Sequence, residues 1–440
     1  MDNTKRYPVI HPNIHTERIQ PLFSQFNLEF DGVEYPIYVN PEAAQILRMC
    51  NGQRTIEEIS QELAIIYADE YDNVLDVVES FLLEAQQHNH VGLLDQSRQL
   101  PPIRSVGSTD YWTPDLLSIE LTHKCPLRCK HCCLSAGEGY TMDDRTLTDI
   151  INQAKDMHIA QIQLTGGEPL LHPRFFDALS ECVANGSIVH VFTSGVICTS
   201  DIIDKFSQFD RKRVFFQISL DGLEEYHDMF RGVRGSFKKS CRFISEIAKL
   251  GFKVTVATTI DNQHKDELLT LFNMCKDLGV SVVRLSGISN RGRAVDNALS
   301  SAQNGLDNII KLQKELAEHL DDDHFKIMLL EDTGHQDKVY LMNCGLGQTS
   351  IKIAPNGDVF ACMMADSPHA NIHHDTLIQI QKNKSRLFEK LTSPTAEKCK
   401  DCDHFAVCEN CIIEGLMYCA KEKREWLRVN EHILHSIYGK

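Results

Sequence analysis

The chain has 440 residues, 42% of them apolar and 24% charged, which is enough for two or three domains with separate cores. Its net charge of −16 disfavours general binding to nucleic-acid backbones, which requires surplus Lys and Arg. No apolar run is long enough to span a membrane, and the first residues lack the apolar segment of a signal peptide. We therefore expect a cytoplasmic protein with no nucleic-acid partner and no membrane partner.

Residues 1–98 are predicted to form a small winged-helix module. The β-rich segment 27–40 is interrupted by Asp31-Gly32, a typical hairpin turn. Thr55 and Glu58 have the spacing of a capping box at a helix start. The three expected helices and a closing strand lie at 41–50, 55–68, 74–87 and 91–94.

The charge of this module argues against DNA binding. Residues 1–95 contain five Lys or Arg and sixteen Asp or Glu, so a duplex would repel them. An acidic winged helix is better suited to offer a strand edge to a peptide, which adds by backbone hydrogen bonds. The polar, proline-containing segment 99–114 is interpreted as a linker.

Residues 115–320 alternate buried strands with amphipathic helices. This order predicts an α/β fold whose parallel sheet, joined by right-handed crossovers, curls into a partial (β/α)6 barrel. Chemistry in such sheets is found at the carboxyl ends of the strands. The predicted strands lie at 116–122, 159–167, 187–195, 213–222, 252–260 and 280–288.

The cysteines carry the strongest chemical pattern. Cys125, Cys129 and Cys132 follow the first barrel strand with C-x3-C-x2-C spacing. Three thiolates from one short loop can hold three irons of a cubane and leave the fourth iron without a protein ligand. A zinc knuckle is the alternative, but an odd set of three thiolates fits it poorly.

A second cysteine group lies in the region 335–425, where little periodicity is visible. Metal clusters are expected to stabilise this region, and a pair of zinc sites remains an alternative to iron. A terminal helix is predicted within 426–440. The seven cysteines of the group are Cys344, Cys362, Cys399, Cys402, Cys408, Cys411 and Cys419.

The first cysteine motif resembles the signature of the radical S-adenosylmethionine (SAM) superfamily, with His131 where an aromatic carbocycle usually precedes the last cysteine. The resemblance implies that Cys125, Cys129 and Cys132 are the catalytic cysteines, and that SAM chelates the open iron and is cleaved to a 5′-deoxyadenosyl radical. A second segment resembles the family's GGEP motif, whose backbone binds the methionine amine. It comprises Gly166, Gly167, Glu168 and Pro169.

Four further residues are candidate SAM contacts by the same resemblance. Ser194, Ser219 and Asp221 lie at strand ends where related enzymes contact the ribose and the carboxylate. Arg231 lies in a segment whose arginine approaches the methionine carboxylate in the family, which suits a guanidinium fork. A capping or surface role is the alternative for each of them. The segment 291–293 could contact substrate acids or face solvent.

The second cysteine group resembles the SPASM extension, which carries two auxiliary iron–sulfur clusters. The resemblance assigns Cys399, Cys402, Cys408 and Cys419 to an outer cluster. It assigns Cys344, Cys362 and Cys411 to an inner cluster with one open iron, unless His335 or Asp337 fills the gap. With the radical SAM cluster, this implies three [4Fe-4S] clusters.

The order of the three modules resembles that of maturases of ribosomally synthesised peptides, with a PqqD-like recognition module in front. Within that group the similarity is to sactisynthases and their ranthipeptide relatives. It implies a precursor peptide as substrate and partner, a flavodoxin or ferredoxin as electron donor, and a thioether product. Alternatives are a C–C or C–O cross-linking or epimerising enzyme, a sulfatase maturase, and an iron–sulfur-sensing winged-helix regulator.

Overall fold

The computed structural model describes residues 3–30, 33–261, 263–299, 306–329, 343–395, 397–399, 411–419 and 425–438. The chain divides into two compact units, with the boundary between Thr113 and Pro114. None of the helices in the described ranges is both long enough and apolar enough to cross a membrane.

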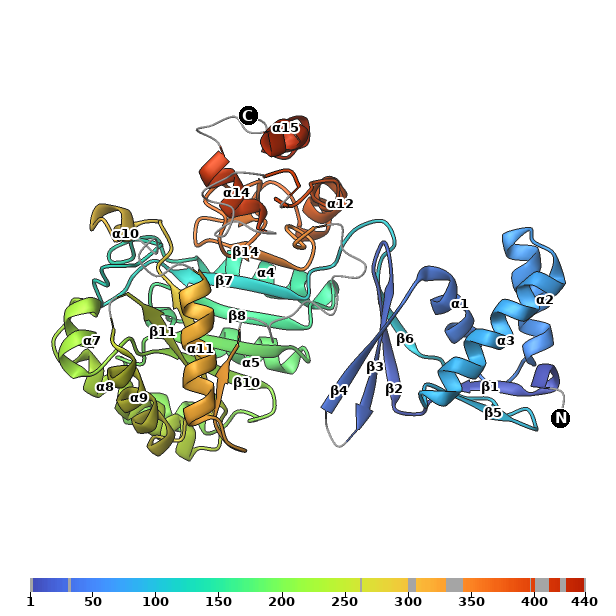
Figure 1. The fold of residues 1–440 in the computed structure, drawn as a ribbon, viewed down its shortest axis with the longest axis horizontal. Coiled ribbons are helices and arrows are strands. Elements are labelled where there is room, and N and C mark those ends of the chain that lie inside the picture. The colour runs from blue at the N-terminus through green and yellow to red at the C-terminus, as the bar shows by residue number, and fades with distance from the viewer. Residues whose placement is uncertain are drawn as a thin grey trace. The chain divides into compact units, whose positions relative to one another are not determined.

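The described part of the first unit combines two small sheets with three α-helices and one short 3-10 helix (Figure 1). One sheet pairs β1 with β5 in antiparallel fashion, and the other has the order β4-β3-β2-β6. The strands are β1 (Tyr7–Ile10), β2 (Ile14–Ile19), β3 (Ser24–Phe30), β4 (Val33–Val39), β5 (Val91–Leu94) and β6 (Arg104–Gly107). The helices are η1 (Asn3–Lys5), α1 (Pro41–Met49), α2 (Ile56–Tyr67) and α3 (Tyr71–Gln87).

The hairpin, the three helices and the closing strand of this unit agree with the sequence prediction. The Thr55 hydroxyl accepts from the Glu58 amide at 3.2 Å, and the Glu58 carboxylate accepts from the Thr55 amide at 2.8 Å, so the capping box is formed. Strands β1 and β2 were not predicted, because the segment before residue 20 is rich in polar residues and has no clear alternation.

The segment 99–114, interpreted as a linker, instead contains strand β6 and belongs to the first unit. Strand β6 pairs in parallel with β2. The carboxylate of Glu17 on β2 is fully buried and accepts hydrogen bonds from Arg48 at 2.6 Å and from Ser105 of β6 at 2.7 Å. Trp112 is also buried. The polar composition of the segment suggested a linker. The structure instead orders it through the pairing of β6 with β2 and through the hydrogen bond from Ser105 to the buried Glu17.

The second unit is built on a curved ten-stranded sheet in the order β13-β12-β11-β10-β9-β8-β7-β14-β15-β16, parallel from β13 to β14. The six predicted barrel strands are present. They are β7 (Leu116–Thr122), β8 (Gln161–Gly166), β9 (Ile188–Thr193), β10 (Val214–Ser219), β11 (Val254–Ile260) and β12 (Val282–Gly287), and β13 (Lys326–Met328) follows them.

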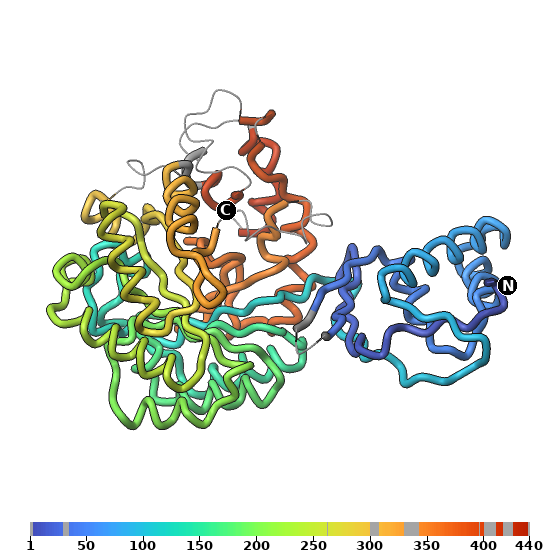
Figure 2. Tube along the Cα trace, turned by 60° about the horizontal axis from the view of Figure 1, so that its bottom comes forward, coloured from blue at the N-terminus to red at the C-terminus, as the bar shows by residue number. Residues whose placement is uncertain are grey.

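Helices cover the outer face of this curved sheet (Figures 1 and 2). The predicted helices at 146–157, 236–251 and 264–279 are observed as α4 (Asp144–Asp156), α8 (Ser236–Lys249) and α9 (Lys265–Asp277). The others are η2 (Pro169–Leu171), α5 (Phe175–Ala184), α6 (Ser200–Phe206), α7 (Glu224–Arg231), α10 (Arg293–Asp296) and α11 (Leu306–Leu320).

The two faces of the barrel sheet differ in burial. On β12, Val283 and Leu285 are fully buried under the outer helices, whereas Arg284 and Ser286, which point to the opposite face, are exposed. Strands β8 to β11 alternate in the same way, with buried and mostly apolar residues outside and partly buried residues inside. The inner face carries apolar as well as polar side chains, such as Phe215 beside Gln217 on β10, so the barrel interior, or lumen, is lined by both kinds.

The last region continues the barrel sheet. Strand β14 (Ser350–Ile353) pairs in parallel with β7, and β15 (Asp358–Phe360) and β16 (Ala370–Asn371) extend the sheet. Both views show the segment from β14 onward, orange to red, on the β7 side of the barrel (Figures 1 and 2). Its helices are α12 (Leu377–Glu389), α14 (Ile412–Cys419) and α15 (Glu425–Tyr438), and α15 corresponds to the predicted terminal helix.

We predict that Leu82→Ala in α3 lowers the free energy of unfolding of the first unit by about 2–5 kcal/mol, because it leaves a cavity in a fully buried position. Hydrogen exchange of the segment 41–94 in the full chain, measured at increasing urea, reports this loss. Val77→Ala on the same helix is the control, since Val77 is 64% exposed and its truncation leaves no cavity. Equal losses from both variants would contradict the described core.

Candidate active site at the carboxyl ends of the barrel strands

The cysteine loop follows β7 and is held by backbone contacts from later parts of the chain. Arg293, after β12, donates from Nε to the Cys129 carbonyl at 2.8 Å and from Nη1 to the Ala136 carbonyl at 2.6 Å. A Cβ on Gly292 would lie 2.5 Å from the Cys132 carbonyl oxygen, so this contact requires glycine. The segment 291–293, which could have faced solvent, thus clamps the predicted ligand loop.

The GGEP segment lies directly against the same loop. The Gly167 amide donates to the Thr122 carbonyl at 2.6 Å, and the Glu168 amide donates to the Lys124 carbonyl at 2.9 Å. A Cβ on Gly167 would stand 2.4 Å from the Lys124 carbonyl oxygen. The two predicted motifs are therefore fixed to each other by main-chain contacts at the ends of β7 and β8.

The Glu168 side chain ties the GGEP segment to β9. Its carboxylate is fully buried and accepts from the Thr193 hydroxyl at 2.6 Å and from the Ser194 amide at 3.0 Å. The Ser194 hydroxyl also donates to it. Burial raises the pKa of Glu168 even though these hydrogen bonds favour its charged form. Glu168 and Ser194 thus bind each other and position the loop backbone.

A buried ion pair connects β10 and α7 to the cysteine loop. Arg231 donates from Nε to Asp221 at 2.5 Å, and its Nη1 lies 3.6 Å from the Cys129 sulfur. Burial alone would raise the pKa of Asp221, but the adjacent Arg231 guanidinium holds it below its usual range. The guanidinium expected to approach a methionine carboxylate is thus paired with Asp221, while its remaining donors face the cysteine loop.

His131 takes the place of the usual aromatic residue in the cysteine motif. Its ring stacks on Phe230, with centroids 4.3 Å apart and an interplanar angle of 12°. Burial lowers the pKa of His131 to about 4, so the ring is neutral near pH 7. His131 therefore provides a flat, uncharged ring at the loop.

The structure brings together every SAM-site residue predicted from the sequence at one end of the barrel. The cysteines follow β7, and Ser194 follows β9. Gly166 ends β8 and is followed by Gly167, Glu168 and Pro169; Ser219 ends β10 and is followed by Asp221; and Arg231 ends α7. Their roles as cofactor ligands stay predictions. Sequence reasoning did not identify Arg293 as a clamp, although a Gly-Arg pair directly after the last long strand was a usable signal.

Three cysteines of the second group also lie together. Cys344, Cys362 and Cys411 pack around one apolar cluster that contains the buried Cys399. Burial raises the pKa of Cys411 to about 11, and the neighbouring Cys344 and Cys362 contribute to the rise. The side chains of Cys402, Cys408 and Cys419, and both His335 and Asp337, lie outside the described residues.

The described thiol groups are compatible with ligands of iron–sulfur clusters. Among the described residues, no three His, Cys, Asp or Glu side chains converge closely enough to hold one metal ion. The thiolates of a cubane bind separate iron corners, so they need not converge on one point. The Ala136 amide lies 3.4 Å from the Cys132 sulfur and the Met364 amide 3.4 Å from the Cys362 sulfur, so both loops can donate to ligated sulfur.

Two buried cations lie between the cysteine groups. Lys352 on β14 pairs with Glu120 on β7 at 3.4 Å, and Glu120 also contacts His123 at 3.0 Å. Arg291 is 7% exposed and lies 3.1 Å from Asp366 and 3.6 Å from Glu414. Burial raises the pKa of Cys133 and of Cys362, and the charges of Lys352 and Arg291 oppose part of that rise. Their charges therefore link the radical-site loop electrostatically to the second group.

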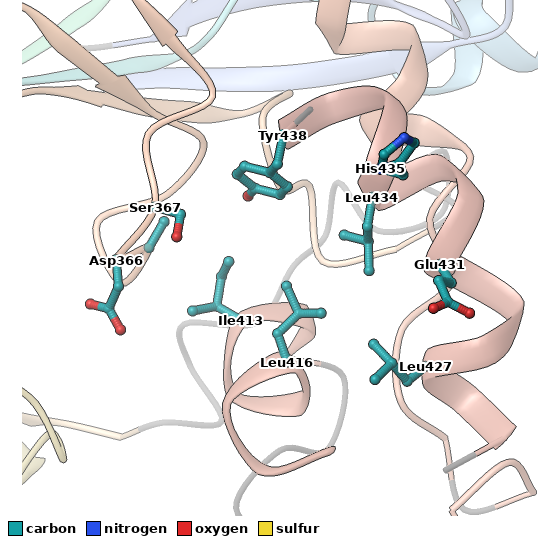
Figure 3. Close-up of a pocket in the computed structure, with 10 residues that line it drawn as sticks. Asp366, Ser367, Ile413, Leu416, Leu427, Glu431, Leu434, His435 and Tyr438 are labelled. Carbon is teal, nitrogen blue, oxygen red and sulfur yellow. The ribbon is translucent and has the colours of Figure 1, made fainter. Parts of the chain in front are cut away.

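A separate cavity of about 560 Å³ lies between α14, α15 and the loop 365–367 (Figure 3). Its walls are mainly apolar, with Leu416 on α14 and Leu427 and Leu434 on α15. No predicted SAM contact lines it. This cavity therefore does not belong to the site at the strand ends.

Three family models match the chain, each in the region expected from the sequence. The Radical SAM superfamily matches residues 119–275, the SPASM iron-sulfur cluster-binding domain matches 344–403, and coenzyme PQQ synthesis protein D (PqqD) matches 35–91. Residues 119–275 of the chain therefore form a radical SAM domain. As a radical SAM protein with a SPASM domain, it uses SAM and iron–sulfur clusters.

Two relatives and one solved structure resemble this radical SAM protein over most of its length. The antilisterial bacteriocin subtilosin biosynthesis protein AlbA of Bacillus subtilis is 26% identical and covers 89% of this chain and 87% of the relative. The sporulation killing factor maturation protein SkfB of the same species is 27% identical, covering 66% and 68%. Streptococcus suis SuiB bound to SAM has the same fold, with a TM-score of 0.65 at 15% identity, covering 93% and 96%.

We predict that Gly167→Ala weakens SAM binding at least about tenfold, because the added methyl group forces the GGEP segment away from the Lys124 carbonyl. Equilibrium dialysis of SAM against the reconstituted protein measures the change, and an unchanged iron content shows that the clusters are intact. Gly186→Ala is the control, since it introduces backbone strain at φ +87° with no atom nearby. Unchanged SAM affinity in Gly167→Ala would contradict the prediction that the GGEP segment contacts SAM.

Proposed function

We propose that this enzyme matures a ribosomally synthesised peptide by joining a cysteine sulfur of the peptide to one of its carbon atoms. The observation that carries the proposal is that one continuous sheet joins the two cysteine groups: the radical SAM loop follows β7, and β14, which pairs with β7, lies in the region that contains Cys344, Cys362 and Cys411. The names of AlbA and SkfB, which refer to bacteriocin biosynthesis and killing-factor maturation, favour a peptide product.

The chemistry divides between cofactor and protein. SAM, cleaved after one-electron reduction at the cluster, supplies the radical that removes a hydrogen atom from a substrate carbon. The protein holds the cysteine loop through Arg293 and Gly167, while the buried Glu168 and Asp221 fix the neighbouring strand ends. Per cross-link the peptide loses one carbon-bound hydrogen to 5′-deoxyadenosine and one thiol proton to solvent. The electron used for cleavage is recovered when the C–S bond forms.

We further propose three [4Fe-4S] clusters and an inner cluster with an open iron. Three cysteines in the inner group leave one corner of a cubane without a protein thiolate. That corner would bind the substrate cysteine and bring its sulfur to the substrate radical. An electron donor such as a flavodoxin or ferredoxin would supply the initial reducing electron.

The main alternative is a C–C or C–O cross-link, or an epimerisation, on the same scaffold. A fully ligated inner cluster would favour it, since the substrate sulfur would then have no binding position. A winged-helix regulator is disfavoured by the acidic first unit and by the intact GGEP segment. A gel-shift assay with duplex DNA at moderate salt tests this alternative, since a regulator would bind the duplex and the proposed enzyme would not.

The decisive experiment uses reconstituted enzyme, SAM, a strong reductant and the precursor peptide encoded beside the gene. We expect 5′-deoxyadenosine and a peptide lighter by two hydrogens per cross-link, with the linked cysteine resistant to alkylation. Cys125→Ala should form neither product, and its iron content should fall from about twelve to about eight per chain. A cross-link that persists after every core cysteine is replaced by serine would overturn the thioether.

We also propose that the first unit binds the leader of the precursor along strand β4, which lies at one edge of its sheet. An added strand bonds through main-chain groups, and Tyr35, 52% exposed on β4, offers a side-chain contact. SuiB has likewise been solved with its precursor peptide SuiA.

For this leader site, we predict that a synthetic leader slows hydrogen exchange of amides in 33–39, because strand addition gives them new acceptors. Strand β6, at the opposite edge of the same sheet, is the internal control and should keep its exchange rates. Protection confined to 104–107 would place the leader on the wrong edge and refute the assignment.

A further inference from the structure

The charged groups that face the barrel lumen are almost all paired. Glu120 pairs with Lys352 and His123, and Asp221 pairs with Arg231. On the remaining strands, His190 contacts Gln161 at 3.0 Å and Lys326 contacts Asp321 at 3.7 Å. Because these groups already have partners within the protein, binding a charged ligand would require them to break an existing contact.

Arg284 is the exception among the described residues. It lies in the middle of β12, with Val283 and Leu285 buried on the outer side, so its side chain points into the lumen. Among the described residues, Arg284 has no hydrogen-bond, ion-pair or ring partner. Its residue is exposed, yet burial lowers its pKa and no charged group offsets that effect. A side chain inside an open, concave lumen can be both exposed to solvent and surrounded by protein atoms that lower its pKa.

The register of the sheet places Arg284 beside the predicted SAM site. Ser219 of β10 lies opposite Ala257 of β11, and Ala257 lies opposite Arg284. Two strand spacings of about 4.8 Å separate the Ser219 and Arg284 backbones, which gives about 10 Å across the same inner face. An arginine side chain spans much of that distance. A group held by Arg284 would therefore lie next to the atoms on which SAM acts.

We propose that Arg284 binds a carboxylate of the substrate peptide inside the lumen and so selects which core residue is presented for hydrogen abstraction. The inference rests on the proposed peptide-modifying function and adds a recognition rule to it. We infer a carboxylate as the bound group because the parallel N–H groups of a guanidinium match a carboxylate in bidentate geometry. Arg284 is an exposed cation with no charged partner among the described residues, so a carboxylate of the substrate can reach and pair with it.

The carboxylate has two possible sources in a peptide, an Asp or Glu side chain near the modified residue and the C-terminus. Three precursor peptides distinguish them: the natural sequence, one with core Asp and Glu changed to Asn and Gln, and one with an amidated C-terminus. The amide variants keep the size and hydrogen-bonding capacity of the acid but lose its charge. Whichever variant loses turnover identifies the bound group.

The experiment compares wild-type enzyme with Arg284→Gln and Arg284→Lys. For wild type, kcat/KM should fall about 10-fold to 100-fold from the natural peptide to the matching amide, because a charge-assisted hydrogen bond is lost. Arg284→Gln should process both peptides at the lower, equal rate, and Arg284→Lys should recover part of the preference. Lys326→Gln, on the same face of the neighbouring strand but paired with Asp321, should keep the wild-type preference.

Two readouts separate this proposal from other roles of Arg284. Peptide-free formation of 5′-deoxyadenosine should be the same in wild type and Arg284→Gln, and a matching loss there would mean that the arginine binds SAM instead. An equal loss on acid and amide peptides would mean a structural role, and would overturn the proposal. A product without a C–S bond would refute the thioether but leave the acid-to-amide comparison readable.

Discussion

The site depends on main-chain contact between the cysteine loop and the loops beside it. Carbonyl groups of the loop accept from Arg293 on one side, and carbonyls of Thr122 and Lys124 accept from Gly167 and Glu168 on the other. These contacts exist because parallel strands β7, β8 and β12 end at one edge of the sheet. Glycine is required at Gly167 and Gly292, since any side chain there would push the loop away.

Two buried carboxylates lie beside this loop, and the protein stabilises them in different ways. Asp221 and Glu168 are both fully buried, but only Asp221 has a cation beside it. Glu168 is stabilised by hydroxyl and amide donors from β9 instead. Both arrangements satisfy a buried carboxylate, as burial requires. Neither acid is left free, and Arg284 is the lumen cation that has no partner among the described residues.

The motifs and the alternating strands and helices were readable from sequence because both are local. The C-x3-C-x2-C loop, the GGEP segment and the six barrel strands each occupy a few consecutive residues. Strands β6 and β14 were missed because their partners, β2 and β7, are about 90 and 230 residues away, and their short segments carry no periodicity. The clamp formed by Arg293 depends on a distant contact in the same way.

The pairing of β14 with β7 attaches the region of the second cysteine group to the barrel sheet. A SPASM domain joined only by a flexible connection would place its thiols at variable distances from the radical loop. Here Lys352 of β14 contacts Glu120 of β7, and Arg291, beside the loop clamp, contacts Glu414 just after Cys411. In the proposed reaction, C–S bond formation requires a fixed separation between the substrate radical and the sulfur. The shared sheet and these two ion pairs restrict how far the two cysteine groups can move apart.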